Sequence, residues 1–256
     1  KRDVSSFVSK NSSAVHEKIG KAYLELNQFE KAIEYLTMLT RENKAEYQMQ
    51  AIEQLYNSIC KYQFSRKRLV DNEYKSALKE IEESIRKMDS LISLSKTSER
   101  YSIRASAYKR KAAIMAQGLF NDFLTNEYSQ EDVQFAIHQA LLDYKIAYSI
   151  STKNKMYPYC NWKELEAIME MFGYFERESS YQLTDDSEVY FVESKKFILT
   201  ELEKEIVEKE NKHLEYWDRV DFANATLCKF LVNRGDDVDK IIKAYNKCWN
   251  YNGSMN

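Results

Sequence analysis

The stretch SAVHEKIGKAYLELNQFEKAIEYLTML, residues 13–39, decides the fold of this chain. Each half carries apolar residues at helical spacing, and the Asn27-Gln28 pair separates the halves. The small residues Gly20 and Ala32, one in each half, stand where two helices would need to approach closely. The stretch therefore predicts two short helices folded back to back. One such pair cannot bury its own apolar face, so further pairs are expected.

The same stretch resembles a tetratricopeptide repeat (TPR), a helix–turn–helix unit of about 34 residues. His16, Leu39 and Lys44 depart from the residues usual at their positions in the repeat. The resemblance implies an all-α protein that forms a TPR-like right-handed superhelix of antiparallel helix pairs. The positions that match the repeat are Ile19, Gly20, Tyr23, Phe29, Ala32 and Leu36.

The composition fits an all-α class and limits the kinds of partner. The 256 residues include only 5 Gly and 1 Pro, fewer than nucleotide-binding folds usually spend on their loops. A formal net charge of −2 disfavours a nucleic-acid partner. The four cysteines are scattered without a CxxC pair, which favours a reducing, cytoplasmic compartment. No apolar run is long enough to span a membrane, and a start at Lys1 suggests a fragment of a longer protein.

Apolar stripes recur along the chain and predict one helical-repeat domain over residues 1–256. Asn121 to Gln130 is expected to be a loop, with Ser129 and Asp132 capping the next helix. The domain would comprise a near-standard repeat at 13–43 and divergent helix pairs at 46–95, 98–150, 158–210 and 213–250.

The second half of the chain has weaker sequence signals for where its helices begin and end. Pro158 is predicted to fix the entry into a helix that begins at Trp162. The polar stretch 178–188 is predicted to be an exposed loop, followed by a long helix from Val189 to Glu210. Cys228 and Cys248 are expected to be core thiols.

Three further segments carry a more particular resemblance: ERYSIRASAYKRKA at 99–112, MYPYCNWKEL at 156–165 and DFANATLCKFLVNRGD at 221–236. Together they resemble the helical region of bacterial proteins that join TPR-like helices to effectors such as CHAT domains, which are caspase-like proteases. They also resemble the central region of apoptosis signal-regulating kinases. Tyr157 and Pro158 fit the family's Tyr-Tyr-Pro-Gly-x-Asn motif, which here lacks the glycine. This resemblance implies a sensor or scaffold segment.

Catalytic and metal-binding patterns are not apparent. A CHAT-type protease needs a His–Cys pair, yet His16, His138 and His213 all fall within helical stripes. Metal ligation would need clustered His, Cys, Asp or Glu at ligand spacing, and no such cluster occurs. We therefore predict no enzymatic activity, no metal and no cofactor for this chain.

Two groups of residues are candidates for contact with a partner. The basic stretch around 104–111 would line one wall of the concave groove, although such a stretch is more commonly a solvated face or a set of structural ion pairs. The aromatic residues beside Pro158 could form a contact surface, although aromatics at helical spacing are commonly core. The candidates are Arg104, Ser106, Lys109, Arg110, Tyr157 and Trp162.

The predicted function is protein–protein interaction, as the scaffold or sensor segment of a larger bacterial effector or signalling protein. A protein or peptide partner would lie in the concave groove. One alternative is the regulatory part of a protease or other enzyme whose catalytic domain lies outside this chain. Another is an RNA- or nucleotide-sensing module that uses residues 104–111. The sequence leaves open the partner, the effector and the oligomeric state.

Overall fold

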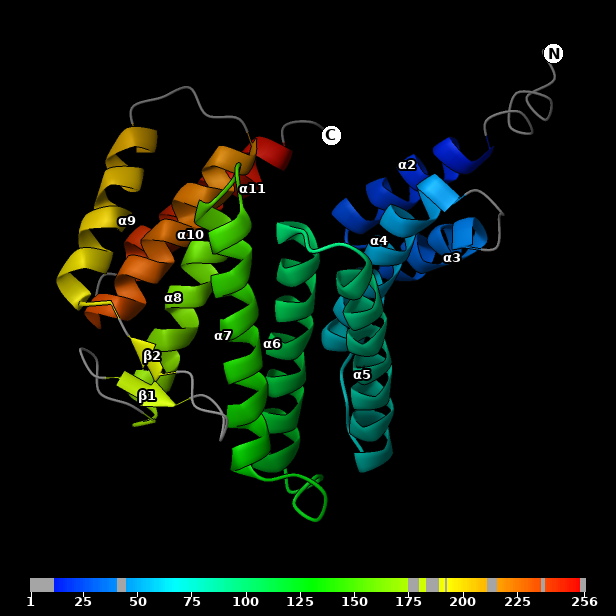
Figure 1. Ribbon diagram of the computed structural model, residues 1–256, viewed down its shortest axis with the longest axis horizontal. Helices are drawn as coiled ribbons and strands as arrows, with labels where there is room; N and C mark the ends of the chain where they lie inside the picture. The colour runs from blue at the N-terminus through cyan, green and yellow to red at the C-terminus, as the bar shows by residue number, and fades with distance from the viewer. Residues whose placement is uncertain are drawn as a thin grey trace. The chain divides into compact units, whose positions relative to one another are not determined.

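The computed structural model describes residues 12–40, 45–174, 180–182, 189–191, 193–210, 216–235 and 238–253. These residues are almost entirely helical, with one short hairpin, which confirms the predicted all-α, TPR-like class (Figure 1). The helices fall into two compact units, Lys1–Asp143 and Tyr144–Asn256. Each unit is described by itself, and a single domain over 1–256 stays a prediction.

Unit 1 is a series of helix pairs in which each helix from Phe29 to Phe120 packs on the one before it. The first helices of successive pairs also contact one another, α2 with α4 and α4 with α6. The elements are α2 (Ser12–Glu25), α3 (Phe29–Thr40), α4 (Ala45–Ser65), α5 (Asp71–Leu94), α6 (Ser98–Phe120) and the first part of α7 (Gln130–Ile150) (Figure 1).

The first pair forms where residues 13–39 predicted it. Asn27 takes a left-handed backbone conformation, with φ 56°, in the turn between α2 and α3. A Cβ at Gly20 would lie 2.8 Å from Leu36, so the missing side chain lets α3 approach α2. Ala32 and Leu36 are fully buried in this contact. The pair is thus closed by small residues on both helices.

The predicted cap of α7 is confirmed. The backbone N–H of Ser129 donates to Asp132 at 2.8 Å, and the backbone N–H of Asp132 donates to the Ser129 hydroxyl at 3.4 Å. This reciprocal pair satisfies donors that the helix itself leaves unpaired. It ends the connection that follows α6 and begins α7 at Gln130.

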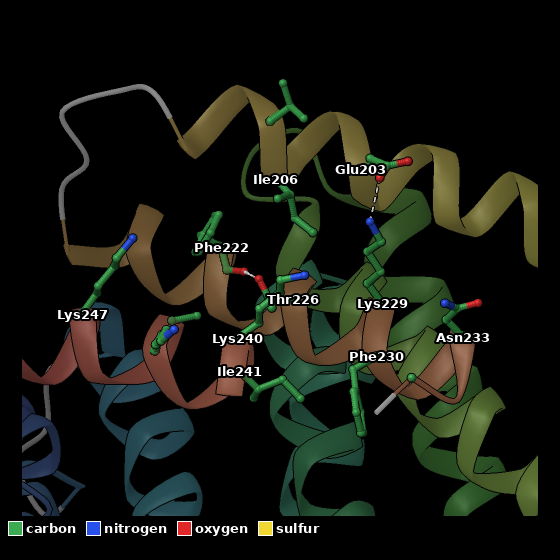
Figure 2. Close-up of a pocket in the computed structure, with 14 residues that line it drawn as sticks. Glu203, Ile206, Phe222, Thr226, Lys229, Phe230, Asn233, Lys240, Ile241 and Lys247 are labelled. Atoms are coloured by element: carbon green, nitrogen blue, oxygen red, sulfur yellow. Dashed lines mark hydrogen bonds and ion pairs between the residues drawn. The ribbon is translucent and has the colours of Figure 1, made fainter. Parts of the chain in front are cut away.

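Unit 2 is organised around α10 (Tyr216–Asn233), on which α8 (Met156–Met171), α9 (Lys195–Glu210) and α11 (Val238–Gly253) all pack. A groove of about 570 Å³ lies over α10 between α9 and α11 (Figure 2). The strands β1 (Ser180–Gln182) and β2 (Val189–Phe191) pair antiparallel, with Tyr181 opposite Tyr190.

The prediction of a helix from Val189 was wrong. The Val-Tyr-Phe run at 189–191 is β-branched and aromatic, and it pairs as a strand. The helix begins at Lys195 because Ser194 caps it, its hydroxyl accepting the Phe197 N–H at 3.3 Å. Residues 183–188 of the predicted loop lie outside the described residues.

The helix predicted to begin at Trp162 begins earlier, at Met156. Pro158 therefore stands in its first turn, where a missing N–H costs no intrahelical hydrogen bond. At the far end Gly173 has φ 73°, and its N–H donates to Glu170 O at 3.1 Å. A left-handed glycine at this place is a common helix end.

A close helix contact gives a test of the packing in unit 1. A Cβ at Gly118 would lie 2.3 Å from Leu124 and 3.1 Å from Tyr74, and both side chains are almost fully buried. Neither has room to move, so Gly118→Ala should lower the free energy of unfolding by about 1–3 kcal/mol. Urea denaturation measures this. The exposed neighbour Gln117→Ala should stay within about 0.5 kcal/mol, and equal midpoints for the two variants would contradict the packing.

Candidate functional site

The first helices of the three pairs in unit 1 present a continuous polar face, which we call the first-helix face. On α4 its members Gln50, Gln54 and Lys61 follow helical spacing. Lys21 on α2 donates to Gln50 at 3.4 Å, and Gln54 donates to Glu99 on α6 at 3.0 Å. The full set is Glu17, Lys21, Gln50, Gln54, Lys61, Glu99 and Arg110.

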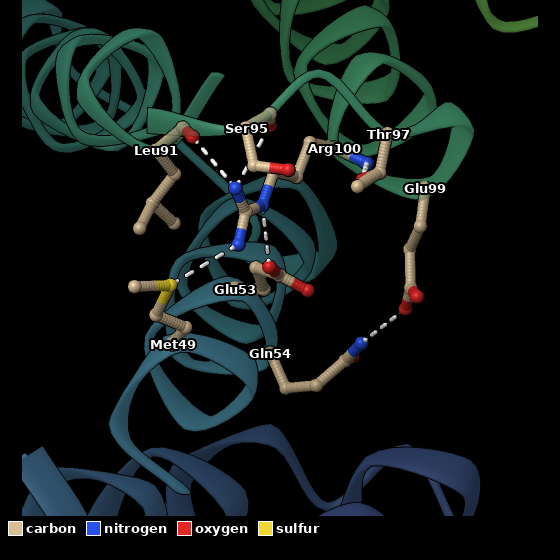
Figure 3. Close-up of polar contacts among 8 residues, drawn as sticks. All are labelled: Met49, Glu53, Gln54, Leu91, Ser95, Thr97, Glu99 and Arg100. Atoms are coloured by element: carbon tan, nitrogen blue, oxygen red, sulfur yellow. Dashed lines mark hydrogen bonds and ion pairs between the residues drawn. The ribbon is translucent and has the colours of Figure 1, made fainter. Parts of the chain in front are cut away.

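Arg100 fixes α6 against the preceding pair (Figure 3). Its guanidinium donates to Glu53 on α4 at 2.7 Å and to two carbonyl oxygens at the end of α5, Leu91 O at 2.7 Å and Ser95 O at 2.8 Å. Arg100 and Glu53 are both buried. Because three helices share one buried cation, their relative positions along the first-helix face are fixed.

Two of the four cations in the basic stretch, Arg104 and Lys111, form ion pairs inside unit 1. Arg104 forms ion pairs with Asp89 and, at 2.6 Å, with Asp143. Lys111 pairs with Glu82 at 2.8 Å. These contacts join α6 to α5 and α7 and use the charges that the sequence made candidates for a partner.

Ser106 and Lys109, two further candidates, expose little of their side chains to solvent. Ser106 is buried and Lys109 is half-buried on α6. Binding through Arg104, Ser106 or Lys109 therefore stays a prediction.

Arg110 differs from its neighbours. Its Nη1 atom is buried and has no hydrogen-bond partner in the part of the chain that the structure describes. The nearby Lys61 on α4 has no ion pair within the same described residues. Burial, and secondarily the charge of Arg110, lowers the pKa of Lys61, while Glu25 acts weakly in the opposite direction. Two half-buried cations thus lie close enough for one to influence the other, and neither forms an ion pair within the described residues.

Sequence reasoning named Arg110 but missed Lys61. Lys61 shares the helical stripe of Gln50 and Gln54, so its position on the first-helix face was readable. Its proximity to Arg110 was not readable, because it depends on how α4 and α6 pack. Such a like-charge pair is unfavourable unless an anion joins it, so the arrangement suits a carboxylate or phosphate.

The two aromatic candidates in unit 2 have different environments. Tyr157 is 38% exposed, and its ring lies edge-on to Tyr144 at 6.2 Å. Trp162 is only 5% exposed, and its ring centroid is 3.4 Å from the ammonium of Lys163. The Trp162 ring is therefore engaged by an internal cation, and of the two only Tyr157 presents surface.

Lys163 is the centre of a buried ionic cluster. It is fully buried, with Glu166 at 3.2 Å and Glu193 at 2.8 Å. Glu166 is also fully buried. A buried charge is tolerated only when paired, so these residues hold the start of α9 against α8.

The thiols are buried and are not activated as nucleophiles. Cys228 and Cys248 are core residues as predicted. Burial raises the pKa of Cys60 to about 11, and a hydrogen bond with Cys228 followed by burial raises that of Cys160. The thiolate is the reactive form of cysteine, and all of these shifts disfavour it.

The other candidate chemistry is equally sparse. Burial lowers the pKa of His138, and His213 lies outside the described residues. Within the described ranges no group of three or more His, Cys, Asp or Glu side chains could hold a metal ion. None of the helices in those ranges is long and apolar enough to cross a membrane.

Helix pairs stacked in chain order, with their first helices in contact, define a helical-repeat protein of the tetratricopeptide class. The family model "Tetratricopeptide Repeats-Sensor" (TPR-S) matches residues 26–166, more than half of the chain, and the chain belongs to this family. Comparisons with curated proteins and with solved structures find no match. The TPR resemblance is confirmed, whereas the resemblance to CHAT proteins and to apoptosis signal-regulating kinases stays a prediction.

The buried cluster in unit 2 can be tested by removing its cation. Lys163→Met removes the cation that neutralises the buried carboxylate of Glu166 and should lower the free energy of unfolding by about 3–5 kcal/mol at neutral pH. Adding Glu166→Gln should recover part of the loss. Lys204, 69% exposed and paired with Glu201 at the same spacing, provides the control, since Lys204→Met should cost at most about 1 kcal/mol. Chemical denaturation measures all three, and similar losses for both lysines would count against the cluster.

Cys60 predicts a pH dependence. Its pKa is about 11 when folded, against an ordinary value of 9.0, so only the unfolded chain ionises the thiol between these values. The stability due to the buried neutral thiol is therefore complete below pH 9 and is lost towards pH 11. The loss should be roughly 2–3 kcal/mol. Cys60→Ala lacks this term, so its deficit relative to the parent chain, measured by urea unfolding, should shrink over that range; a constant deficit would refute the assignment.

Proposed function

We propose that this TPR-S module is a partner-binding sensor that holds an acidic protein segment on the first-helix face of α2, α4 and α6. TPR domains are generally non-catalytic scaffolds, and the family supports a repeat-based interaction or sensor module. The observation that carries the proposal is the pair Lys61 and Arg110. Both cations lack an ion pair within the described residues, and the buried Nη1 of Arg110 lacks any hydrogen bond there.

An acidic side chain placed between these cations would supply the missing counterion. A carboxylate accepts two hydrogen bonds from a guanidinium in a fixed geometry and also attracts the lysine. The neighbouring hydrogen bonds Lys21–Gln50 and Gln54–Glu99 are polar contacts that an extended segment could exchange or extend. In a TPR stack the first helices line the concave side, where partners commonly bind.

The larger context remains part of the proposal. The module would serve a bacterial effector or signalling protein, and the partner's occupancy would be communicated through the packed helix pairs. A regulatory role beside a catalytic domain outside this chain is compatible with the same surface. Its four unpaired, buried thiols suit the cytoplasm, where we place it.

A polyanion such as RNA is the weaker alternative. Arg104 and Lys111, two of the four cations in the basic stretch 104–111, already have carboxylate partners inside unit 1. Polyanion binding needs several cations that release their counterions together. The local pair Lys61 and Arg110 instead suits one carboxylate, which favours a peptide.

The proposal makes stability and binding move in opposite directions. Lys61→Gln or Arg110→Gln removes a like-charge contact and should raise the free energy of unfolding by about 0.5 kcal/mol. The same change should weaken binding of a fluorescent polyglutamate peptide by about fivefold to tenfold. Thermal denaturation and fluorescence anisotropy give the two readouts.

Lys111→Gln is the matched control, since it makes the same charge change on α6 but removes a cation that Glu82 already pairs. It should give no gain in stability and change peptide affinity less than about twofold. If all three variants weaken the peptide equally, binding reflects net charge alone and the first-helix face is not the site. Loss of stability in Lys61→Gln would show that the cation has a structural role.

A further inference from the structure

The groove in unit 2 is built by three helices that come after the family match, which ends at residue 166. Its floor is α10, where Phe222, Thr226, Phe230 and Asn233 follow one another at about one helical turn. Eleven residues of helix span about 16 Å, or three turns. The groove is therefore long and narrow, with the length of a short helix.

Both walls of the groove contribute apolar side chains beside their charged ones. Ile206 of α9 and Ile241 of α11 lie on opposite sides of the floor (Figure 2), and Val207 and Ala244 also line the groove. Val207 is 56% exposed, which is unusual for an apolar side chain among other apolar side chains. An open groove lined in this way matches the mode in which an amphipathic helix inserts its apolar face between two others.

The rim of the groove is cationic. Lys240, Lys243 and Lys247 follow one another on α11 at spacings of three and four, so they form a single stripe along one edge. Lys243 and Lys247 have no ion pair within the described residues, and Lys247 lies 6.0 Å from the Phe222 ring centroid. The stripe fixes the charge of whatever covers the groove.

The one acidic side chain in the lining, Glu203 of α9, is already paired. It accepts a hydrogen bond from Lys229 of α10 at 2.7 Å, across the gap between the two helices (Figure 2). No acidic lining residue is thus left to pair with Lys243 or Lys247. A cationic edge beside an apolar floor is complementary to an acidic, amphipathic partner.

We propose that this groove binds an acidic amphipathic helix of a partner protein, parallel to α10 and between α9 and α11. Its apolar face would cover Phe222, Phe230 and Ile241, and its acidic residues at i, i+3 and i+7 would meet the lysine stripe. This site is separate from the first-helix face and does not depend on the function proposed there.

The test uses the full chain and a synthetic helical peptide of about 14 residues, with leucines along one face and glutamates beside them. Fluorescence anisotropy should detect binding that the double variant Lys243→Glu and Lys247→Glu weakens by at least about tenfold. A peptide with lysines in place of the glutamates should bind that double variant better than it binds the parent chain. Failure of the acidic peptide to bind the parent chain would overturn the proposal.

The matched control is Lys196→Glu with Lys204→Glu, which makes the same charge change on exposed residues of α9 outside the groove lining. It should change affinity less than about threefold. Val207→Glu places an acid on the wall at a half-exposed position and should also weaken the peptide, with circular dichroism confirming the fold. Equal losses of peptide affinity in both double variants would show that binding depends on net charge alone and would refute the groove as the binding site.

Two other occupants would also overturn the proposal. Sedimentation could show that the chain self-associates and that the Lys243→Glu and Lys247→Glu variant does not, which would assign the groove to a second copy. Decanoate could displace the peptide and bind the parent chain with the same dependence on the lysines, which would assign it to a fatty carboxylate. Variants at Lys61 and Arg110 should leave peptide binding here unchanged, so the two proposals can fail separately.

Discussion

The buried guanidinium of Arg100 is the constraint on which the rest of unit 1 depends. Removing Arg100 and Glu53 from water is costly, and the cost is offset only when every donor finds its acceptor. Those acceptors come from α4 and from the last carbonyl oxygens of α5, so a slip of α6 by one residue would break the set. The pairing therefore selects one arrangement of helices more than it adds stability. The first-helix face exists because α4 and α6 are held at that one offset.

The cations among the described residues fall into two groups, those that form ion pairs within the protein and those that do not. Arg104 and Lys111 form ion pairs that link α6 to neighbouring helices, and Lys163 forms ion pairs inside unit 2. Lys61 and Arg110 have no ion pair within the described residues, and burial followed by the charge of Arg110 lowers the pKa of Lys61. Proteins tolerate such local conflict chiefly where a ligand resolves it. The two unpaired cations are thus a better indication of a binding site than the basic character of residues 104–111.

The sequence predicts those features that depend on contacts between neighbouring residues, and it does not predict those that depend on contacts between distant residues. Local rules found the first helix pair, the Ser129 and Asp132 cap and the helix-initiating position of Pro158, because each depends on neighbours in sequence. They failed at 189–191, where strand propensity and the Ser194 cap outweighed an apolar helical pattern. The contact between the Trp162 ring and the buried ammonium of Lys163 could not be predicted either, since it depends on how the helices pack. The pairing of Lys61 with Arg110 is a tertiary property that no local pattern encodes.

The two candidate surfaces are unlike in chemistry, and this bears on what the chain can sense. The first-helix face is polar and carries two cations without ion pairs in the described residues, so under the proposal it would select a partner by charge and hydrogen-bond geometry. The groove on α10 is apolar with a lysine edge, so it discriminates by helical amphipathicity. The part of the first-helix face on α4 and α6 falls within the family match, its α2 part precedes that match, and the groove lies beyond it. Since apolar contact supplies affinity and charge supplies selectivity, the groove is where this chain can acquire a partner that the family signature does not specify.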